Sequence, residues 1–324
     1  ASTDIYGFGG GPCYGCGGYG GPAVVAQGDA RTDAAGNLTL SIPADPRRYR
    51  LSQQWSVEAD VSDVDNASIS GRTIVSVHKG LFYVGLRGPS ALAVAGKPVR
   101  IDLLSIGQDG TTLIPRVPLT VTLYRRTYRT VFAGGLPQWQ PVDTLITSFA
   151  AATNGRGRGS IVVTLPSSGE FRLAAAAHDA RGNLVRSAIS LYAAGPDEAA
   201  SPWANPPQDR ITLVLDRRLY RVGDVARVLV AAPRPGMTAL VTIERGRVYS
   251  HQVLRFSGAS PILRVPIRPG YLPDIFLSVV LVAGSGPHAG TPLWKMGLAE
   301  LPVDVRARKL TVTLHAGTLR AHPG

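Results

Sequence analysis

Hydrophobic and polar residues alternate along most of this chain, in short runs that end at turns rich in Gly, Pro and Asp. Successive side chains of a β-strand point to opposite faces, so a period of two is typical of strands with one buried face. Residues 213–226 show the pattern well, because an alternating run passes Tyr220, turns at Gly223 and continues as a new run. The chain has no obvious helical segment, and the sequence therefore predicts an all-β protein.

This phrase of strand, aromatic residue, glycine turn and strand recurs in the chain. Looser copies at 83–99 and 310–324 place the turn glycines Gly96, Gly223 and Gly324 roughly a hundred residues apart. A repeat of this length predicts tandem antiparallel β-sandwiches, each with about seven strands. Because the last copy stops at its turn, we expect the chain to be a piece of a longer array.

Changes in composition divide the chain into six expected segments. These are a Gly-rich flexible segment (1–23), part of a β-sandwich (24–79), a complete sandwich (80–194), a Pro-rich linker (195–208), a second complete sandwich (209–307) and the first strand of a further domain (308–324). In the second segment the alternation predicts strands at 38–42, 55–61 and 73–78. That is about half a sandwich, so we expect the missing half to precede Ala1 or to lie on another chain.

The two complete sandwiches have clear expected strands. In the first, alternation predicts strands at 82–86, 99–103, 119–124, 139–142, 143–149, 160–165, 170–177 and 184–193. In the second, it predicts strands at 211–216, 226–232, 239–244, 249–256, 262–266, 275–283 and 298–304.

The chain is strongly basic, with a net charge of +12 that comes almost entirely from arginine. These residues are spread singly along the expected strands, and no pattern of a nucleic-acid-binding motif accompanies them, so nucleic acid is not an expected partner. No run approaches the length of about 18 apolar residues that a membrane-spanning helix needs, so no transmembrane segment is expected.

Two sets of residues could carry binding or redox chemistry. Cys13 and Cys16 form a Cys-x-x-Cys pair, which can be a redox pair, half of a zinc site or a local disulfide. Neither a βαβ context nor a second pair of ligands is visible, which favours a disulfide or two idle thiols. Asp60, Asp63 and Asp65 are candidate calcium ligands, because Ca²⁺ binds clustered oxygen atoms; the alternative is turn formation by Asp side chains.

Enzyme chemistry has little support. The histidines lie at expected strand ends or in loops, without a Gly-x-Ser-x-Gly elbow, and the glutamates do not pair at a spacing suited to acid–base catalysis. The glycines at 7–11 lack the Lys-Ser or Lys-Thr of a phosphate-binding loop. We expect no catalytic residue and no cofactor. Glu244 and Arg245 are expected to form a local ion pair at a hairpin.

Several phrases carry a resemblance to a known family. They are residues 220–230, 239–246, 273–282 and 310–314, together with weaker matches at 32–36, 57–63 and 70–72. Over roughly residues 28–324 this order resembles the macroglobulin domains of the alpha-2-macroglobulin family, most closely its bacterial branch. The resemblance implies seven-stranded antiparallel sandwiches of the immunoglobulin-like or fibronectin III-like kind.

The family resemblance also implies a function. Whole members trap proteases after cleavage of a bait segment, and many then bind the protease through a thioester formed within Cys-x-Glu-Gln. Here Cys13 is followed by Tyr14-Gly15-Cys16, so no thioester function carries over. We expect a non-catalytic scaffold fragment of an extracytoplasmic protease inhibitor, whose partners are neighbouring macroglobulin domains and, through the full-length parent, proteases. The alternative is a structural or adhesive extracellular stalk that spaces a distant binding domain.

Overall fold

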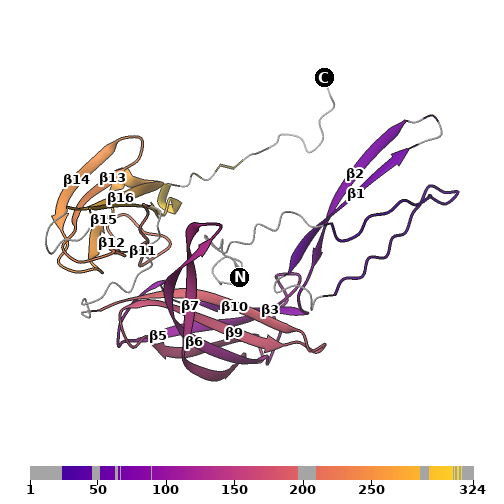
Figure 1. The fold of residues 1–324 in the computed structure, drawn as a ribbon, viewed down its shortest axis with the longest axis horizontal. Coiled ribbons are helices and arrows are strands. Elements are labelled where there is room, and N and C mark those ends of the chain that lie inside the picture. Colours follow the sequence, from indigo (N-terminus) through magenta and orange to yellow (C-terminus); the bar gives the residue numbers. More distant parts are fainter. Residues whose placement is uncertain are drawn as a thin grey trace. The chain divides into compact units, whose positions relative to one another are not determined.

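The structure is a computed structural model that describes residues 24–45, 52–62, 65, 67–88, 90–195, 209–284, 292–308, 310, 312–313 and 315. Most residues up to Ala194 fall into one compact unit, and most residues from Gly195 on fall into another. The described residues form β-strands and two short 3-10 turns, η3 (Pro269–Tyr271) and η4 (Arg306–Arg308), with no α-helix among them. The predicted all-β fold class is confirmed (Figure 1).

A two-stranded hairpin precedes the first sandwich. Strand β1 (Gln53–Ser62) pairs with β2 (Ser68–Val77) in antiparallel register, which confirms the strands expected at 55–61 and 73–78. The strand expected at 38–42 is wrong, because these residues are extended without strand pairing and Leu40 is 60% exposed. Alternation alone does not form a strand where no neighbouring strand completes the hydrogen bonds.

The first sandwich consists of two antiparallel sheets around one core. One sheet has the order β3 (Phe82–Arg87), β5 (Pro98–Gly107), β8 (Arg158–Thr164). The other has the order β4 (Leu92–Val94), β10 (Leu184–Ala194), β9 (Gly169–His178), β6 (Pro118–Ala133), β7 (Leu136–Ala152). Fully buried residues of both sheets, including Leu86, Ile101, Phe171 and Leu173, interdigitate between them.

The longest element of this sandwich differs from the expected pattern. Strands β6 and β7 pair continuously from Pro118–Ala152 to Ala133–Leu136, through a bulge at Leu123/Tyr124, where three separate strands were expected. The hairpin projects beyond the sandwich in Figure 1. Its turn contains Gly134 and Gly135, both with positive φ (59° and 77°), a conformation that glycine adopts without steric cost.

The second sandwich has the seven strands that the sequence predicts. One sheet has the order β11 (Leu213–Leu215), β12 (Val225–Val230), β15 (Ile262–Pro266), and the other has the order β14 (Val248–Arg255), β13 (Thr238–Glu244), β16 (Asp274–Ala283), β17 (Leu293–Pro302). Tyr220, Val228, Met237, Ile275 and Leu277 are among the fully buried residues of its core. Strand β17 begins at Leu293 and not at residue 298 as expected.

Several expected segments lie outside the described residues. They are the Gly-rich segment 1–23, nearly all of the linker 195–208 and most of 308–324. The limits of the six segments therefore stay a prediction, whereas most of the strands within the two sandwiches are confirmed.

Candidate functional site

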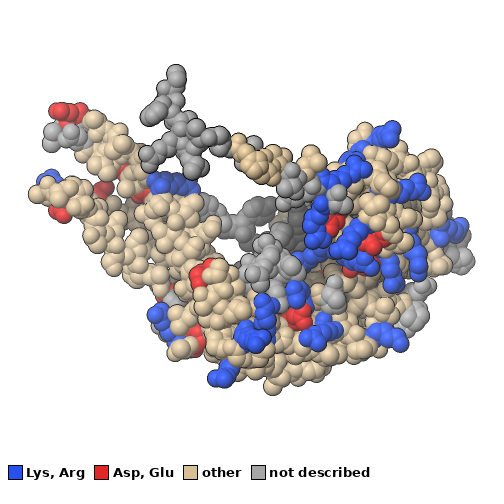
Figure 2. Space-filling view, turned by 180° about the vertical axis from the view of Figure 1, so that it is seen from behind, with Lys and Arg blue, Asp and Glu red and all other residues tan. Residues whose placement is uncertain are grey.

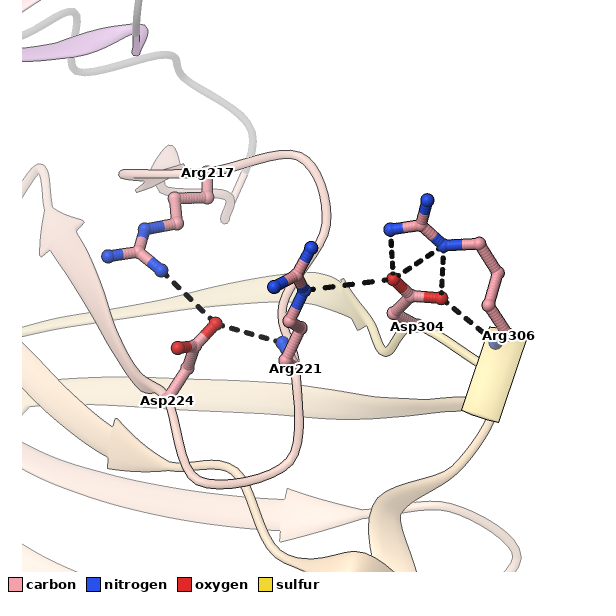
Figure 3. Close-up of polar contacts among 5 residues, drawn as sticks. All are labelled: Arg217, Arg221, Asp224, Asp304 and Arg306. Carbon is pink, nitrogen blue, oxygen red and sulfur yellow. Dashed lines mark hydrogen bonds and ion pairs between the residues drawn. The ribbon is translucent and has the colours of Figure 1, made fainter. Parts of the chain in front are cut away.

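A network of charged side chains lies at one end of the second sandwich, where the chain leaves β17. Its residues come from two places that are far apart in sequence, the loop between β11 and β12 and the segment after β17 (Figure 3). The five residues drawn there are Arg217, Arg221, Asp224, Asp304 and Arg306. We call this set the exit network.

Tyr220 anchors the loop that carries half of the exit network. Its ring is fully buried in the core, and its hydroxyl donates a hydrogen bond to Oδ1 of Asp216 at 2.9 Å. The backbone N–H of Arg217 donates to the same hydroxyl at 3.2 Å. Burial raises the pKa of Tyr220, and the bond to Asp216 raises it further, so the hydroxyl keeps the proton that it donates.

Asp224 closes the same loop as a turn. One carboxylate oxygen accepts from the backbone N–H of Arg221 at 2.9 Å and from the guanidinium of Arg217 at 3.1 Å. Gly223 has φ of 94°, which a residue with a Cβ rarely adopts. The turn at Gly223 therefore has a local cause, because the glycine adopts the required φ and the carboxylate of Asp224 accepts from the backbone of Arg221.

Asp304 is the centre of the other half of the network. It accepts hydrogen bonds from the backbone N–H of Arg306 at 2.9 Å and from its guanidinium at 2.6–3.0 Å. The guanidinium of Arg221 lies 3.9 Å away. These contacts, chiefly the side-chain bonds from Arg306, lower the pKa of Asp304 to about 2, so the carboxylate is ionised at neutral pH.

Backbone hydrogen bonds join the two halves. The N–H of Tyr220 donates to the carbonyl of Pro302 at 2.9 Å, and the N–H of Asp304 donates to the carbonyl of Tyr220 at 2.7 Å. Together they form a parallel bridge between Tyr220 and Val303. The segment that follows β17 is therefore held against a residue that is itself fixed in the core.

The second unit is rich in cations. Residues 209–308 contain fourteen Lys and Arg against seven Asp and Glu. Figure 2 shows the blue side chains spread over this unit with few red ones between them. Each of the three carboxylates named above accepts from an arginine side chain or an arginine backbone N–H, so these ionic contacts join the two loops.

The residues singled out in the sequence lie elsewhere. Cys13, Cys16 and Asp63 are outside the described residues. Asp60 lies on β1 and accepts a hydrogen bond from the hydroxyl of Ser70 at 2.5 Å. Within the part of the chain that the structure describes, no group of three or more His, Cys, Asp or Glu could hold a metal ion. The disulfide and the calcium site both stay predictions.

The expected ion pair of Glu244 with Arg245 is wrong. The guanidinium of Arg245 turns away from Glu244 and donates to the carbonyls of Leu272 at 2.5 Å and Asp274 at 2.8 Å. Four carbonyl contacts outweigh one surface carboxylate, because a surface ion pair is worth at most about 1 kcal/mol.

Sequence reasoning missed the exit network. The repeated phrase contains Asp224, but a contact between Arg221 and Asp304 joins residues more than eighty positions apart. It follows only from the strand order that places β17 beside the β11–β12 loop. In the local sequence, the pattern Asp-x-Arg at 304–306 is the one signal that could have indicated part of this network.

The chain is similar in sequence to several known proteins. Residues 211–324 match the family model described as "Alpha-2-macroglobulin bait region domain". A curated alpha-2-macroglobulin homolog of Nostoc sp. is 22% identical over 307 residues, covering 92% of this chain and 16% of that protein. The alpha-2-macroglobulin of Ralstonia nicotianae is 27% identical over 240 residues, covering 73% of this chain and 13% of that protein.

Among solved structures, the native conformation of Escherichia coli alpha-2-macroglobulin is similar at 18% identity and a TM-score of 0.33, covering 78% of this chain and 17% of that one. The chain thus spans less than a fifth of the length of the two curated relatives. In the described residues, no helix is long and apolar enough to cross a membrane.

Proposed function

The comparisons support an alpha-2-macroglobulin-family fragment, and from that premise we propose that this chain is a non-catalytic scaffold segment that supports protease trapping. Its partners in that role are neighbouring macroglobulin domains and, through the full-length parent, proteases. The role places the parent outside the cytoplasm. We also propose the limits 80–194 and 209–307 for the two complete domains.

One observation carries the proposal. The match to the bait region domain begins at residue 211, just before β11, and includes the whole exit network. Next to this network, backbone hydrogen bonds hold the segment after β17, at Asp304, to Tyr220 in the core of the sandwich. A trap that works by rearrangement needs such a fixed point, because a cut in a bait segment changes the whole assembly only if the flanking chain is attached to something stiff.

The proposed contribution of this chain is therefore mechanical. Close-packed cores resist deformation and transmit displacement as rigid bodies. The two sandwiches supply that stiffness, and the exit network supplies the attachment. A covalent trapping step is not part of the proposal, because Cys13 and Cys16 are not followed by the Glu-Gln that a thioester needs.

The test uses the full-length parent with several endoproteases of different specificity. We expect a small number of discrete cleavage products together with a change in sedimentation coefficient, which reports a change of shape. Replacing both Arg221 and Arg306 by Gln in the parent should leave the cleavage sites unchanged and reduce the change in sedimentation.

Two results would contradict the proposal. Ragged digestion without discrete products would exclude a bait segment. Discrete cleavage without any change in sedimentation would favour the stalk, which needs no rearrangement.

A further inference from the structure

Two arginines face each other on the small sheet of the second sandwich. The register of β12 and β15 places Arg227 directly opposite Arg264. Both side chains are exposed on the outer face of the sheet, because the residues beside them, such as Ala226 and Leu263, face the core. Like charges directly opposite each other on neighbouring strands destabilise a sheet. An anionic group that binds both guanidinium groups would remove this repulsion.

Arg268 extends this pair toward the loop between β11 and β12. It follows Ile267, whose backbone N–H donates to the carbonyl of Asp224 at 2.8 Å and whose carbonyl accepts from the N–H of Gly223 at 2.9 Å. The end of β15 is thus joined to the turn of that loop. The three arginines therefore lie at the same end of the sandwich as the exit network (Figure 3).

This end of the sandwich has an excess of positive charge. Eight arginines and three aspartates, a net charge of +5, occur in the three segments that we call the cationic end, residues 216–227, 264–268 and 303–308. All three aspartates accept hydrogen bonds within this end. Asp274, at the start of β16, lies 3.9 Å from the guanidinium of Arg245, so that pair adds no net charge. Among the described residues, no carboxylate pairs with Arg227, Arg264 or Arg268.

Aliphatic side chains lie among these arginines. Leu219, Val222, Val225 and Val305 are between 43% and 50% exposed. Along the β11–β12 loop they alternate with cations, so that each exposed aliphatic side chain is next to an arginine or one residue away from a charged side chain. The cationic end thus offers both positive charge and apolar surface to a partner.

The combination of charge and aliphatic side chains indicates the kind of partner. Proteins bind single-stranded nucleic acid with exposed aromatic rings, whereas Tyr220, the one aromatic residue in the sequence of the cationic end, is buried. A soluble anion contacts the cations and gains nothing from aliphatic neighbours. An anionic membrane surface contacts both, because its phosphates attract arginines and the boundary of its acyl chains takes up aliphatic side chains. Arginine suits this position, since its aliphatic stem lies in the apolar boundary while the guanidinium reaches the phosphates.

We propose that the cationic end binds the surface of an anionic lipid bilayer. Leu219 and Val222 enter the boundary between headgroups and acyl chains, and Arg227, Arg264 and Arg268 bind lipid phosphates. The contact is peripheral and reversible, because each arginine strengthens binding by only about fivefold and the aliphatic area is small. This function goes beyond protease trapping, since it needs neither a bait segment nor a rearrangement.

The first experiment measures co-sedimentation of the 324-residue chain with large unilamellar vesicles. Vesicles of phosphatidylcholine mixed with phosphatidylglycerol are compared with vesicles of phosphatidylcholine alone. We expect binding to the mixed vesicles only, and weaker binding at high salt, because salt screens exposed charges. The triple variant Arg227→Gln, Arg264→Gln, Arg268→Gln should weaken this binding on the order of 100-fold, at about fivefold for each arginine.

A second triple variant controls for net charge. Arg156→Gln, Arg186→Gln, Arg255→Gln removes the same charge from three exposed positions outside the cationic end, and it should weaken binding much less. The arginines replaced in the first triple variant lie outside the exit network, so the experiment tests membrane binding separately from the proposed trapping.

The second experiment tests the aliphatic side chains. Leu219→Ser with Val222→Ser leaves the charge unchanged and should weaken vesicle binding several-fold, whereas any binding of a soluble polyanion, inositol hexakisphosphate, should not change. The matched control, Leu240→Ser with Val253→Ser, removes two exposed aliphatic side chains from β13 and β14 and should leave vesicle binding unchanged. All variants are checked for unchanged thermal unfolding.

Three results would overturn the proposal. The first is a chain that does not bind the mixed vesicles. The second is an equal loss of binding in the two triple variants, which would show that net charge alone attracts the chain. The third is binding of inositol hexakisphosphate together with normal vesicle binding by Leu219→Ser with Val222→Ser, which would identify a site for soluble anions.

Discussion

At the scale of single residues, the second sandwich depends on a buried hydroxyl. Tyr220 is the largest fully buried side chain in the molecule's described part, and its hydroxyl joins Asp216 to the backbone of Arg217. Removing the hydroxyl leaves an acceptor of Asp216 and a donor of Arg217 without this partner, and an unmade buried hydrogen bond costs more than the bond itself contributes.

Tyr220→Phe is therefore expected to lower the free energy of unfolding by about 1–2 kcal/mol. Urea denaturation followed by fluorescence measures the change. The control is Tyr249→Phe, whose hydroxyl lies 3.4 Å from Arg245 Nη2, at the long limit of a hydrogen bond. Equal losses for both variants would show that the two hydrogen bonds of the Tyr220 hydroxyl contribute no more to stability than the long contact of Tyr249 does.

Asp304 gives the exit network a dependence on pH. Its pKa is about 2 in the folded chain and about 3.9 in an unfolded one, so its stabilising contacts are complete above about pH 4 and are lost as the pH falls through 2. The free energy of unfolding of the wild-type chain should therefore fall more steeply between about pH 4 and 2 than that of Asp304→Asn.

Chemical denaturation at several pH values across this window compares the two slopes. Arg306→Gln removes the main side-chain donor to Asp304 and should give a slope between those of the wild-type chain and Asp304→Asn, because the backbone N–H of residue 306 and the guanidinium of Arg221 remain. Identical slopes in all three proteins would mean that the contacts of Asp304 do not contribute to stability.

At the scale of elements, the β6–β7 hairpin is attached to its sandwich by a row of polar side chains. The register places Asp143 on β7, Arg126 on β6, Glu170 on β9 and Tyr192 on β10 in one line across four strands. Arg126 donates two bonds of 2.8 Å to Asp143, and Tyr128 donates to Glu170 at 2.9 Å. Burial raises the pKa of Glu170, although the bond from Tyr128 and the charge of Arg126 oppose the shift.

Because the pKa of Glu170 is raised on folding, the folded chain binds its proton more tightly than the unfolded chain. Stability from this group is therefore present at acid pH and is lost as the pH rises from the unfolded value of about 4.3 through the folded pKa. Glu170→Gln keeps the shape and the acceptor for Tyr128 but removes the charge. The free energy of unfolding of the variant minus that of wild type should therefore increase from pH 4 to pH 8, which means that the variant becomes relatively more stable, as denaturation at both values measures. A constant difference would contradict the prediction.

The same elements show how far the sequence determines the fold. Period-two alternation is a local property, and it located most of the strands of both sandwiches. It failed at 38–42, where a partner strand decides the outcome, and beyond Tyr124 in β6, where polar residues such as Arg126 continue the strand by pairing with residues of β7 such as Asp143. The exit network depends on strand order, which no local pattern specifies. Alternation likewise gave no sign that Arg227 and Arg264 lie directly opposite each other, because the register that pairs β12 with β15 is not a local property.

At the scale of the whole molecule, the two sandwiches have separate hydrophobic cores. A separate core is the basis of an independently cooperative domain. Leu173→Ala, in the first core, and Leu277→Ala, in the second, each delete a fully buried side chain and should each cost about 2–5 kcal/mol.

Calorimetry should therefore show two transitions. Leu173→Ala should lower the melting temperature of one of them, and Leu277→Ala should lower that of the other. Both variants thus serve as controls for each other. A single transition that both variants shift equally would show that the two cores unfold as one cooperative body.

The bridge between Tyr220 and Val303 also sets how the second sandwich responds to force. A force applied to the chain beyond Arg308 acts on the two backbone hydrogen bonds of that bridge at the same time. In an unzipping hairpin, by contrast, the hydrogen bonds break one after the other. Tension would thus pass first into a tyrosine embedded in the core, and the sandwich would resist extension as a unit.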